Sequence, residues 1–205
     1  MIRRSLILGA MLLVAGCGPR REPLSVYQSI PDFVLTAQTG QEFRSAEMLK
    51  GRIWIADFIF TSCTGPCPRM SSQMRRLQEN LKDLPDVRFV SFSVDPVNDT
   101  PQVLAAYAKR FEADQSRWAF LTGSQKSLNA LAREAFLLGT VDGSLNHSTR
   151  FVLVDREGRV RRLYGSSEPG VVGIILDDVR HLAKAGALCR ALWSRLPICP
   201  PSTQP

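Results

Sequence analysis

The feature that most constrains the fold is an apolar run at residues 53–60 that leads directly into two cysteines and a helix. This run, IWIADFIF, is almost wholly apolar and rich in β-forming residues, which predicts a strand covered on both faces. Residues 66–81 are expected to form the helix that follows. Its apolar side chains recur at spacings of four, three and four, on one helical face: Met70, Met74, Leu77 and Leu81.

The two cysteines, Cys63 and Cys67, lie in the sequence CTGPCP between the predicted strand and helix. A helix N-terminus carries unpaired N–H groups and a partial positive charge, so we expect both thiols to be exposed and to ionise more readily than free cysteine. A spacing of four residues brings the sulfurs within about one helical turn. A Cys63–Cys67 disulfide and a two-sulfur metal site are therefore both open, and so is a purely structural pair.

The remaining patterns predict an α/β fold with a mixed central sheet flanked by helices. Thr100 and Pro101 are expected to begin a helix as N-cap and first helical residue. Glu157 and Gly158 are expected to form the turn of an antiparallel hairpin. The predicted strands are 87–94, 118–121, 151–154 and 160–164, with a short hairpin around 38–41, and the further helices are 101–111, 125–136 and 171–188.

The N-terminus has the pattern of an export signal. Residues 1–16 begin with Arg3 and Arg4 and continue as an apolar run of about ten residues, too short to span a bilayer as a helix. The run ends in LVAGC, which resembles a bacterial lipobox and predicts that Cys17 is lipidated; an ordinary cleaved signal peptide is the alternative. We expect residues 17–29 to form a tether, with the domain exported and lipid-anchored at the periplasmic or outer face of a bacterial membrane.

Charge and the remaining cysteines add two expectations. The chain of 205 residues has a formal charge of +7, which falls to +5 without Arg3 and Arg4. Its basic residues are scattered, so nucleic acid is not an expected partner. Residues 30–188 should form a single domain, and 189–205 a C-terminal extension in which Cys189 and Cys199 are expected to form a disulfide.

His147 lies in a polar loop just before the predicted strand at 151–154. Loops at one edge of an α/β sheet gather over the strand ends, so its imidazole could complete a site with the two thiolates of Cys63 and Cys67. Two sulfurs and one imidazole suit Cu(I), and also Cu(II) with an added ligand. A closed zinc site would need four protein ligands.

Three segments together resemble the Sco (SenC/PrrC) family of membrane-anchored, thioredoxin-like copper proteins. They are FTSCTGPCP at 60–68, SVDPVNDTP at 93–101 and His147-Ser148 before a strand, turn and strand. The resemblance implies a thioredoxin-like fold with insertions and copper bound by Cys63, Cys67 and His147. It also implies a metallochaperone that delivers copper to the CuA site of cytochrome c oxidase during its assembly, with subunit II as the acceptor.

Several alternatives stay open beside this resemblance. Asp95 and Asp99 could face the site or a partner, or simply form an Asp-Pro turn and a helix lead-in. A thiol–disulfide oxidoreductase, with Cys63 and Cys67 as the catalytic pair, is the alternative function. The three-residue spacer between the cysteines, and the lack of proline between Pro101 and Pro169, weaken that alternative. His147 discriminates between the two, because dithiol exchange does not need it.

Overall fold

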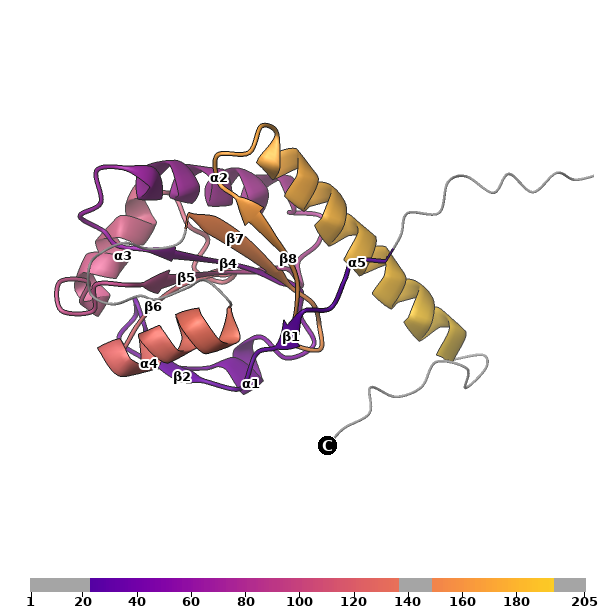
Figure 1. Ribbon diagram of the computed structural model, residues 1–205, viewed down its shortest axis with the longest axis horizontal. Coiled ribbons are helices and arrows are strands. Elements are labelled where there is room, and N and C mark those ends of the chain that lie inside the picture. Colours follow the sequence, from indigo (N-terminus) through magenta and orange to yellow (C-terminus); the bar gives the residue numbers. More distant parts are fainter. Residues whose placement is uncertain (1–22, 137–148, 194–205) are drawn as a thin grey trace, which may run out of the picture.

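The computed structural model describes residues 23–136 and 149–193, in which one mixed sheet carries helices on both faces (Figure 1). The strands are β1 (Gln28–Ser29), β2 (Val34–Ala37), β3 (Glu42–Arg44), β4 (Trp54–Ile59), β5 (Arg88–Ser93), β6 (Trp118–Thr122), β7 (Arg150–Val154) and β8 (Arg159–Gly165). The helices are α1 (Ser45–Met48), α2 (Pro66–Asn80), α3 (Pro101–Arg110), α4 (Gln125–Ala130), the π-helical turn η1 (Leu131–Ala135) and α5 (Val171–Trp193). The strand order is β1-β8-β7-β4-β5-β6-β2-β3. The predicted α/β class with a mixed central sheet is confirmed.

The centre of the sheet consists of the parallel strands β4, β5 and β6. Every residue of β4 is buried, as its continuous apolar run predicts. The helices α2 and α3 make the two crossovers that parallel neighbours require. The carboxyl ends of the three strands therefore meet at one edge of the sheet, which places the segments after Ile59 and after Ser93 side by side.

Antiparallel strands flank this centre on both sides. β7 pairs with β4 and with β8, and Gly158 makes the hairpin turn between β7 and β8 with a φ of 73°, a left-handed conformation that favours glycine. The β2–β3 hairpin adds to β6 on the other side. The strand β1 pairs with β8, so the sheet extends into the segment expected to act as a tether.

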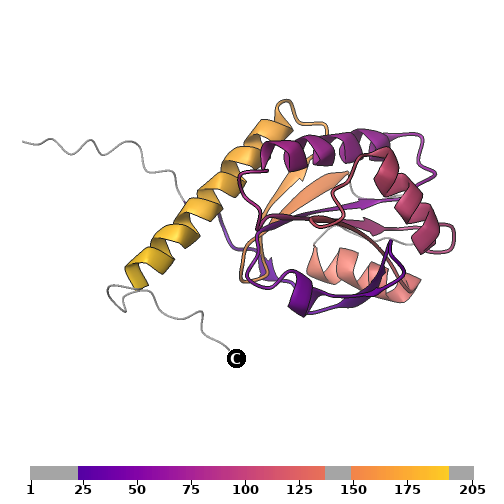
Figure 2. The same ribbon diagram turned by 180° about the vertical axis from the view of Figure 1, so that it is seen from behind.

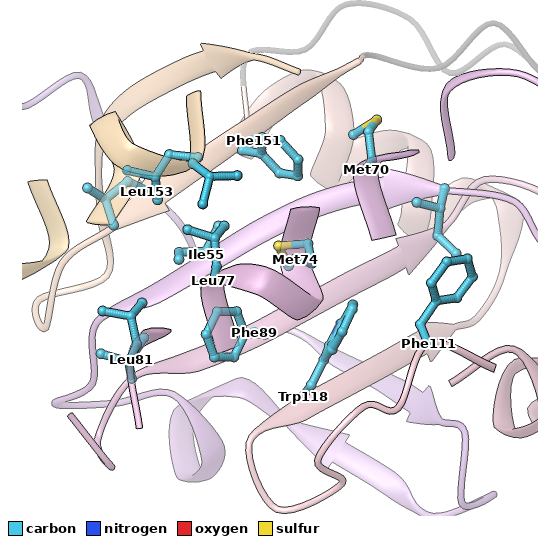
Figure 3. Close-up of a cluster of buried hydrophobic side chains, with 14 of the residues drawn as sticks. Ile55, Met70, Met74, Leu77, Leu81, Phe89, Phe111, Trp118, Phe151 and Leu153 are labelled. Atoms are coloured by element: carbon cyan, nitrogen blue, oxygen red, sulfur yellow. The ribbon is translucent and has the colours of Figure 1, made fainter. Parts of the chain in front are cut away.

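Two hydrophobic layers sandwich the sheet. The helices α2, α3 and α5 cover one face, whereas α1 and α4 cover the other, as the views from the two sides show (Figures 1 and 2). Figure 3 shows Met74 and Leu77 of α2 over Ile55 and Phe89 of the sheet. Met70, Met74 and Leu77 of α2 and Leu81, which caps its C-terminus, are all fully buried, which confirms the helical face predicted from their spacing.

Most predicted elements are confirmed within one or two residues, including the Thr100 cap, whose side chain accepts a hydrogen bond from the N–H of Val103. Two helices differ. The one expected at 125–136 is an α-helix only to Ala130 and continues as the π-helical η1. The last helix extends five residues past 188 to Trp193, so Cys189 lies within α5. Among the described residues, no helix combines the length and apolar character needed to cross a membrane.

Candidate metal centre

Cys63 and Cys67 lie at the carboxyl edge of β4, Cys63 on the turn that leads into α2 and Cys67 in the first turn of that helix. The N–H of Cys63 donates to the carbonyl oxygen of Phe60 at 3.3 Å, which closes the turn. Gly65 directly precedes the helix, Pro66 is its first residue and Cys67 its second. Pro66 suits that position because its ring presets φ and the first helical N–H has no partner to lose. Within the described residues, neither cysteine forms a disulfide.

The two thiols have different surroundings. Cys63 is half-buried, whereas Cys67 is fully buried. The expectation that both sulfurs are exposed and easily ionised is therefore wrong for Cys67. Burial raises the pKa of the Cys67 thiol well above its usual range, because a thiolate there loses the solvation of water. A hydrogen bond from the backbone of Phe60 lowers that pKa only in part, while the Cys63 thiol, its hydrogen-bond partner, raises it further.

Asp57 is a buried carboxyl that affects the pKa of the Cys67 thiol. It is buried in the middle of β4, and burial raises the pKa of its carboxyl to about 7. Its charge is also among the causes that raise the pKa of Cys67. The sequence analysis did not single out Asp57, although it is the one charged residue in the apolar run at 53–60. A single charged residue in a strand predicted to be covered on both faces was the sequence signal that could have identified Asp57.

Asp99 lies beside the cysteine turn, on the segment after β5. Its side chain is fully buried and accepts hydrogen bonds from Thr61, two residues before Cys63. The structure thus brings Asp99 to the candidate site. Asp95 instead accepts both side-chain hydrogen bonds of Asn98, at 3.0 and 2.8 Å, and shapes the loop between them.

The start of β7 lies at the same edge of the sheet. β7 is antiparallel to β4 with Val152 opposite Ala56, and continuing that register places Arg150 beside Phe58. The carbonyl oxygen of Thr149 accepts the N–H of Ser166 at 2.8 Å. Ser166 is in turn linked to α2, because its carbonyl oxygen accepts the side-chain amide of Gln73 at 3.0 Å. The chain before β7 therefore emerges next to α2.

Arg69 also connects α2 to this region. Its guanidinium donates to the hydroxyl of Ser167 at 3.0 Å and, at 3.4 Å, to that of Ser166. These two hydrogen bonds connect the first turn of α2 to the segment after β8. The exposed Arg69 side chain therefore lies against the protein surface and does not extend into solvent.

Four of the candidate site residues from the sequence analysis have no described side chain. His147, Cys17 and Cys199 lie outside the described residues, and for Cys189 only the helical backbone is described. Within residues 23–136 and 149–193, no group of three or more His, Cys, Asp or Glu side chains gathers into a metal site. Cys63 and Cys67 are thus the described part of the candidate centre, and their soft sulfur donors fit copper(I).

Comparison with known proteins identifies the family. The SCO1/SenC family model matches residues 22–184, which include β1 to β8 and the first part of α5. The chain belongs to the SCO1/SenC family. Among curated relatives, the SCO1 protein homolog of Bacillus subtilis is 35% identical over 175 residues, covering 82% of this chain and 90% of the relative.

Solved structures of the SCO1/SenC family have the same fold. A SCO1/SenC family lipoprotein from Bacillus anthracis superposes with a TM-score of 0.71 at 36% identity, covering 80% of this chain and 98% of its own. BsSco, a cytochrome c oxidase assembly protein with a disulfide switch, superposes with a TM-score of 0.69 at 33% identity, covering 79% of this chain and 98% of its own. Arabidopsis thaliana ScoI with copper bound superposes with a TM-score of 0.60 at 25% identity, covering 74% of this chain and 98% of its own. The thioredoxin-like expectation is confirmed by these neighbours.

Proposed function

We propose that this SCO1/SenC protein binds one copper ion through Cys63, Cys67 and His147 and delivers it to the CuA site of cytochrome c oxidase during assembly of that enzyme. Copper is the cargo, and subunit II of the oxidase is the acceptor. Family membership supports this function, since BsSco is a cytochrome c oxidase assembly protein and ScoI of Arabidopsis thaliana has been solved with copper bound.

The observation that carries the proposal is the pair of neighbouring thiols at the carboxyl edge of β4, where α2 begins. The Cys63 and Cys67 side chains are hydrogen-bond partners, so both sulfurs can reach one metal ion. Thiolates favour Cu(I) over harder divalent ions. A relative with copper bound and two neighbouring thiols in this chain point to the same cargo.

His147 is the proposed third ligand. The first residue of β7, Arg150, lies beside Phe58 of β4 by strand register. Cys63 follows Phe58 by five residues, on the turn after β4. His147 comes three positions before Arg150 in the sequence, and three extended residues span about 10 Å. An imidazole attached at this edge therefore has the reach to join the thiols.

The unequal burial of the thiols supports a delivery mechanism. Cys63 is half-buried and accessible to a partner, whereas Cys67 is fully buried. Both sulfurs bind copper as thiolates, so loading releases the proton that burial holds on Cys67. During delivery, partner thiolates replace Cys63 first and Cys67 afterwards, by ligand exchange without a change in the copper oxidation state.

The proposed function includes attachment to a membrane through a lipid on Cys17. The SCO1/SenC relative from Bacillus anthracis is a lipoprotein, which supports this part. An exported domain held at the periplasmic or outer membrane face would meet a membrane-embedded acceptor on its own side. Mass spectrometry of the mature chain tests the anchor, because lipidation predicts Cys17 as the first residue with an added diacylglyceryl mass.

A Cu(I) titration of the full chain in mild detergent, against a competing chelator, tests the copper site. We expect one tight equivalent that is lost or greatly weakened in Cys63→Ala, Cys67→Ala and His147→Ala. His181→Ala is the matched control for the imidazole, and Cys189→Ala is the control for the thiols; both should bind like wild type. Tight binding that survives His147→Ala would refute the three-ligand site.

Thiol–disulfide exchange is the second candidate, and the reduced, neighbouring thiols of Cys63 and Cys67 favour it. In that reaction one thiolate attacks the disulfide of a partner and the other resolves the mixed disulfide. Reduction of a CuA-type dithiol peptide from its disulfide form separates the two functions. Activity that is retained in His147→Ala, together with weak copper binding by wild type, would favour the oxidoreductase.

A further inference from the structure

A buried carboxylate from the segment after β5, the neighbouring strand of β4, holds the turn that leads into the two cysteines. Asp99 is 0% exposed, and both of its oxygens accept hydrogen bonds. Oδ1 lies 2.5 Å from Oγ1 of Thr61 and 3.2 Å from the Thr61 nitrogen, while Oδ2 lies 3.3 Å from that nitrogen. Ser93 donates its hydroxyl to Oδ2 at 2.6 Å. Most of the hydrogen bonds that Asp99 accepts therefore come from Thr61, on the turn that leads into the two cysteines.

Asp99 itself is fixed to the sheet. Ser93 is the last residue of β5, and its hydroxyl oxygen also accepts the N–H of Asp95 at 3.0 Å. The N–H of Asp99 donates to the carbonyl oxygen of Asp95 at 2.8 Å, and the next residue, Thr100, caps α3. The carboxylate is thus held by β5 and α3, independently of the turn that it binds.

The position of Thr61 affects both sulfurs through its neighbour Phe60. Phe60 directly precedes Thr61; its carbonyl oxygen accepts the N–H of Cys63, and its backbone is a hydrogen-bond partner of the Cys67 thiol. A shift of Thr61 would therefore move the backbone groups that orient each cysteine. Burying a carboxylate is costly unless donors surround it, and here the chain supplies those donors from the cysteine turn itself.

We propose that Asp99 is a positioning residue of the metal site, which fixes the turn at residues 60–63 so that the sulfurs of Cys63 and Cys67 stay at the separation that copper requires. This inference rests on the proposed copper-binding function. Groups that orient metal ligands typically change metal affinity by 10- to 100-fold when they are removed. Asp99 acts through Thr61 and does not itself bind the metal.

Two variants test the proposal in the full chain, with Cu(I) and a competing chelator as the probe. Asp99→Asn replaces one acceptor oxygen by a donor, and we expect Cu(I) affinity to fall by about 10- to 100-fold. Thr61→Val removes only the 2.5 Å hydrogen bond, and we expect a smaller loss of about fivefold. If Asp99→Asn fails to fold, Thr61→Val decides the test.

Asp178→Asn is the matched control for loss of a buried carboxylate. Asp178 is also 0% exposed, but it binds Tyr164 and Arg162 at the contact between α5 and β8. This variant should lower the urea midpoint while leaving Cu(I) affinity within about twofold of wild type. If Asp99 had a merely structural role, Asp99→Asn would likewise lower the urea midpoint and leave Cu(I) affinity unchanged. That result would overturn the positioning role of Asp99 but not the proposed copper site.

A copper-free readout separates this inference from the proposed function. Oxidised glutathione takes two electrons from Cys63 and Cys67, which form a disulfide and lose two protons, and two glutathione thiols result. Looser positioning lowers the effective concentration of one thiol near the other, so the equilibrium constant for this disulfide should fall about tenfold in Asp99→Asn. If wild type binds no Cu(I), the proposed function fails and this equilibrium alone decides: a fall supports positioning, and an unchanged constant overturns it.

Discussion

Asp57 and Ser91 are directly opposite each other on the parallel strands β4 and β5, and the Ser91 hydroxyl donates to Oδ1 of Asp57 at 2.6 Å. The indole N–H of Trp118 on β6 donates to the same hydroxyl at 3.0 Å, which extends the network across three strands. Among the described residues, Oδ2 of Asp57 has no hydrogen-bond partner. A carboxyl with one free buried oxygen favours its neutral form, so the fold stabilises protonated Asp57.

The first prediction concerns the pH dependence of stability. Burial raises the pKa of Asp57 from 3.8 to about 7, so between these values the folded state holds a proton that the unfolded chain has lost. The contribution of Asp57 to stability is therefore greatest below pH 4 and declines as the pH rises to 7. At 1.36 kcal/mol per pKa unit, Asp57→Asn should gain roughly 4 kcal/mol relative to wild type between pH 4 and 8 in urea unfolding.

Asp114→Asn provides a control of opposite sign. The Ser116 hydroxyl lowers the pKa of Asp114, so this carboxylate stabilises the fold above its titration range, and the variant should lose stability relative to wild type as the pH rises from 3 to 5. A difference between Asp57→Asn and wild type that does not change with pH would show that burial does not hold the proton on Asp57.

The second prediction concerns the reactivity of the two thiols. Cys63 is half-buried, whereas Cys67 is fully buried and its pKa is raised, so iodoacetamide should modify Cys63 about tenfold faster or more at pH 8. Peptide mapping of Cys63→Ala and Cys67→Ala measures each thiol alone, without a disulfide between them. Equal rates in the two variants would mean that Cys67 is readily exposed in solution.

A third prediction concerns the layer between α2 and the sheet. Met74 is fully buried among apolar side chains of both elements (Figure 3), so Met74→Ala should lower the free energy of unfolding by about 3 kcal/mol. Met48, which is 48% exposed at the end of α1, gives the control. Met48→Ala should change the free energy of unfolding by less than about 0.5 kcal/mol. Similar losses in both variants would contradict the packing described for α2.

A fourth prediction concerns how the N-terminal segment is held. Arg161 pairs with buried Asp155 at 2.9 Å and donates to the carbonyl oxygens of Leu24 and Ser25. Arg161→Ala should release this segment, so limited proteolysis before residue 30 should become about five- to tenfold faster. Arg44→Ala is the control, because its ion pair with Glu42 is exposed at the surface. Unchanged cleavage would show that the pairing of β1 with β8 suffices to hold the segment.

Local patterns predicted most of the architecture because they report the periodicity of helices and strands and the residues at which these elements begin and end. The apolar run before Cys63 predicted a central strand, and the spacing from Met70 to Leu81 predicted the buried face of α2. The turn at Gly158 and the cap at Thr100 are also local signals. Each of these depends on residues close in sequence, and tertiary packing did not override them.

The same local reasoning was wrong about Cys67. A helix N-terminus favours a thiolate, and on that basis both sulfurs were expected to ionise readily. The close packing of α2 against the sheet buries Cys67, and desolvation outweighs the favourable helix end. Burial depends on what covers a residue, and the covering elements come from distant parts of the chain.

The sequence by itself determined the strand, cysteine pair and helix, the family motifs and therefore the chemistry that this edge of the sheet can perform. Only the tertiary structure decided how the site is supported. Asp99 reaches Thr61 across 38 residues, and Asp57 meets Ser91 across 34, because parallel pairing brings β4 and β5 together. Which donor meets a buried carboxylate is determined by strand register and helix packing, and no spacing of neighbouring residues encodes that contact.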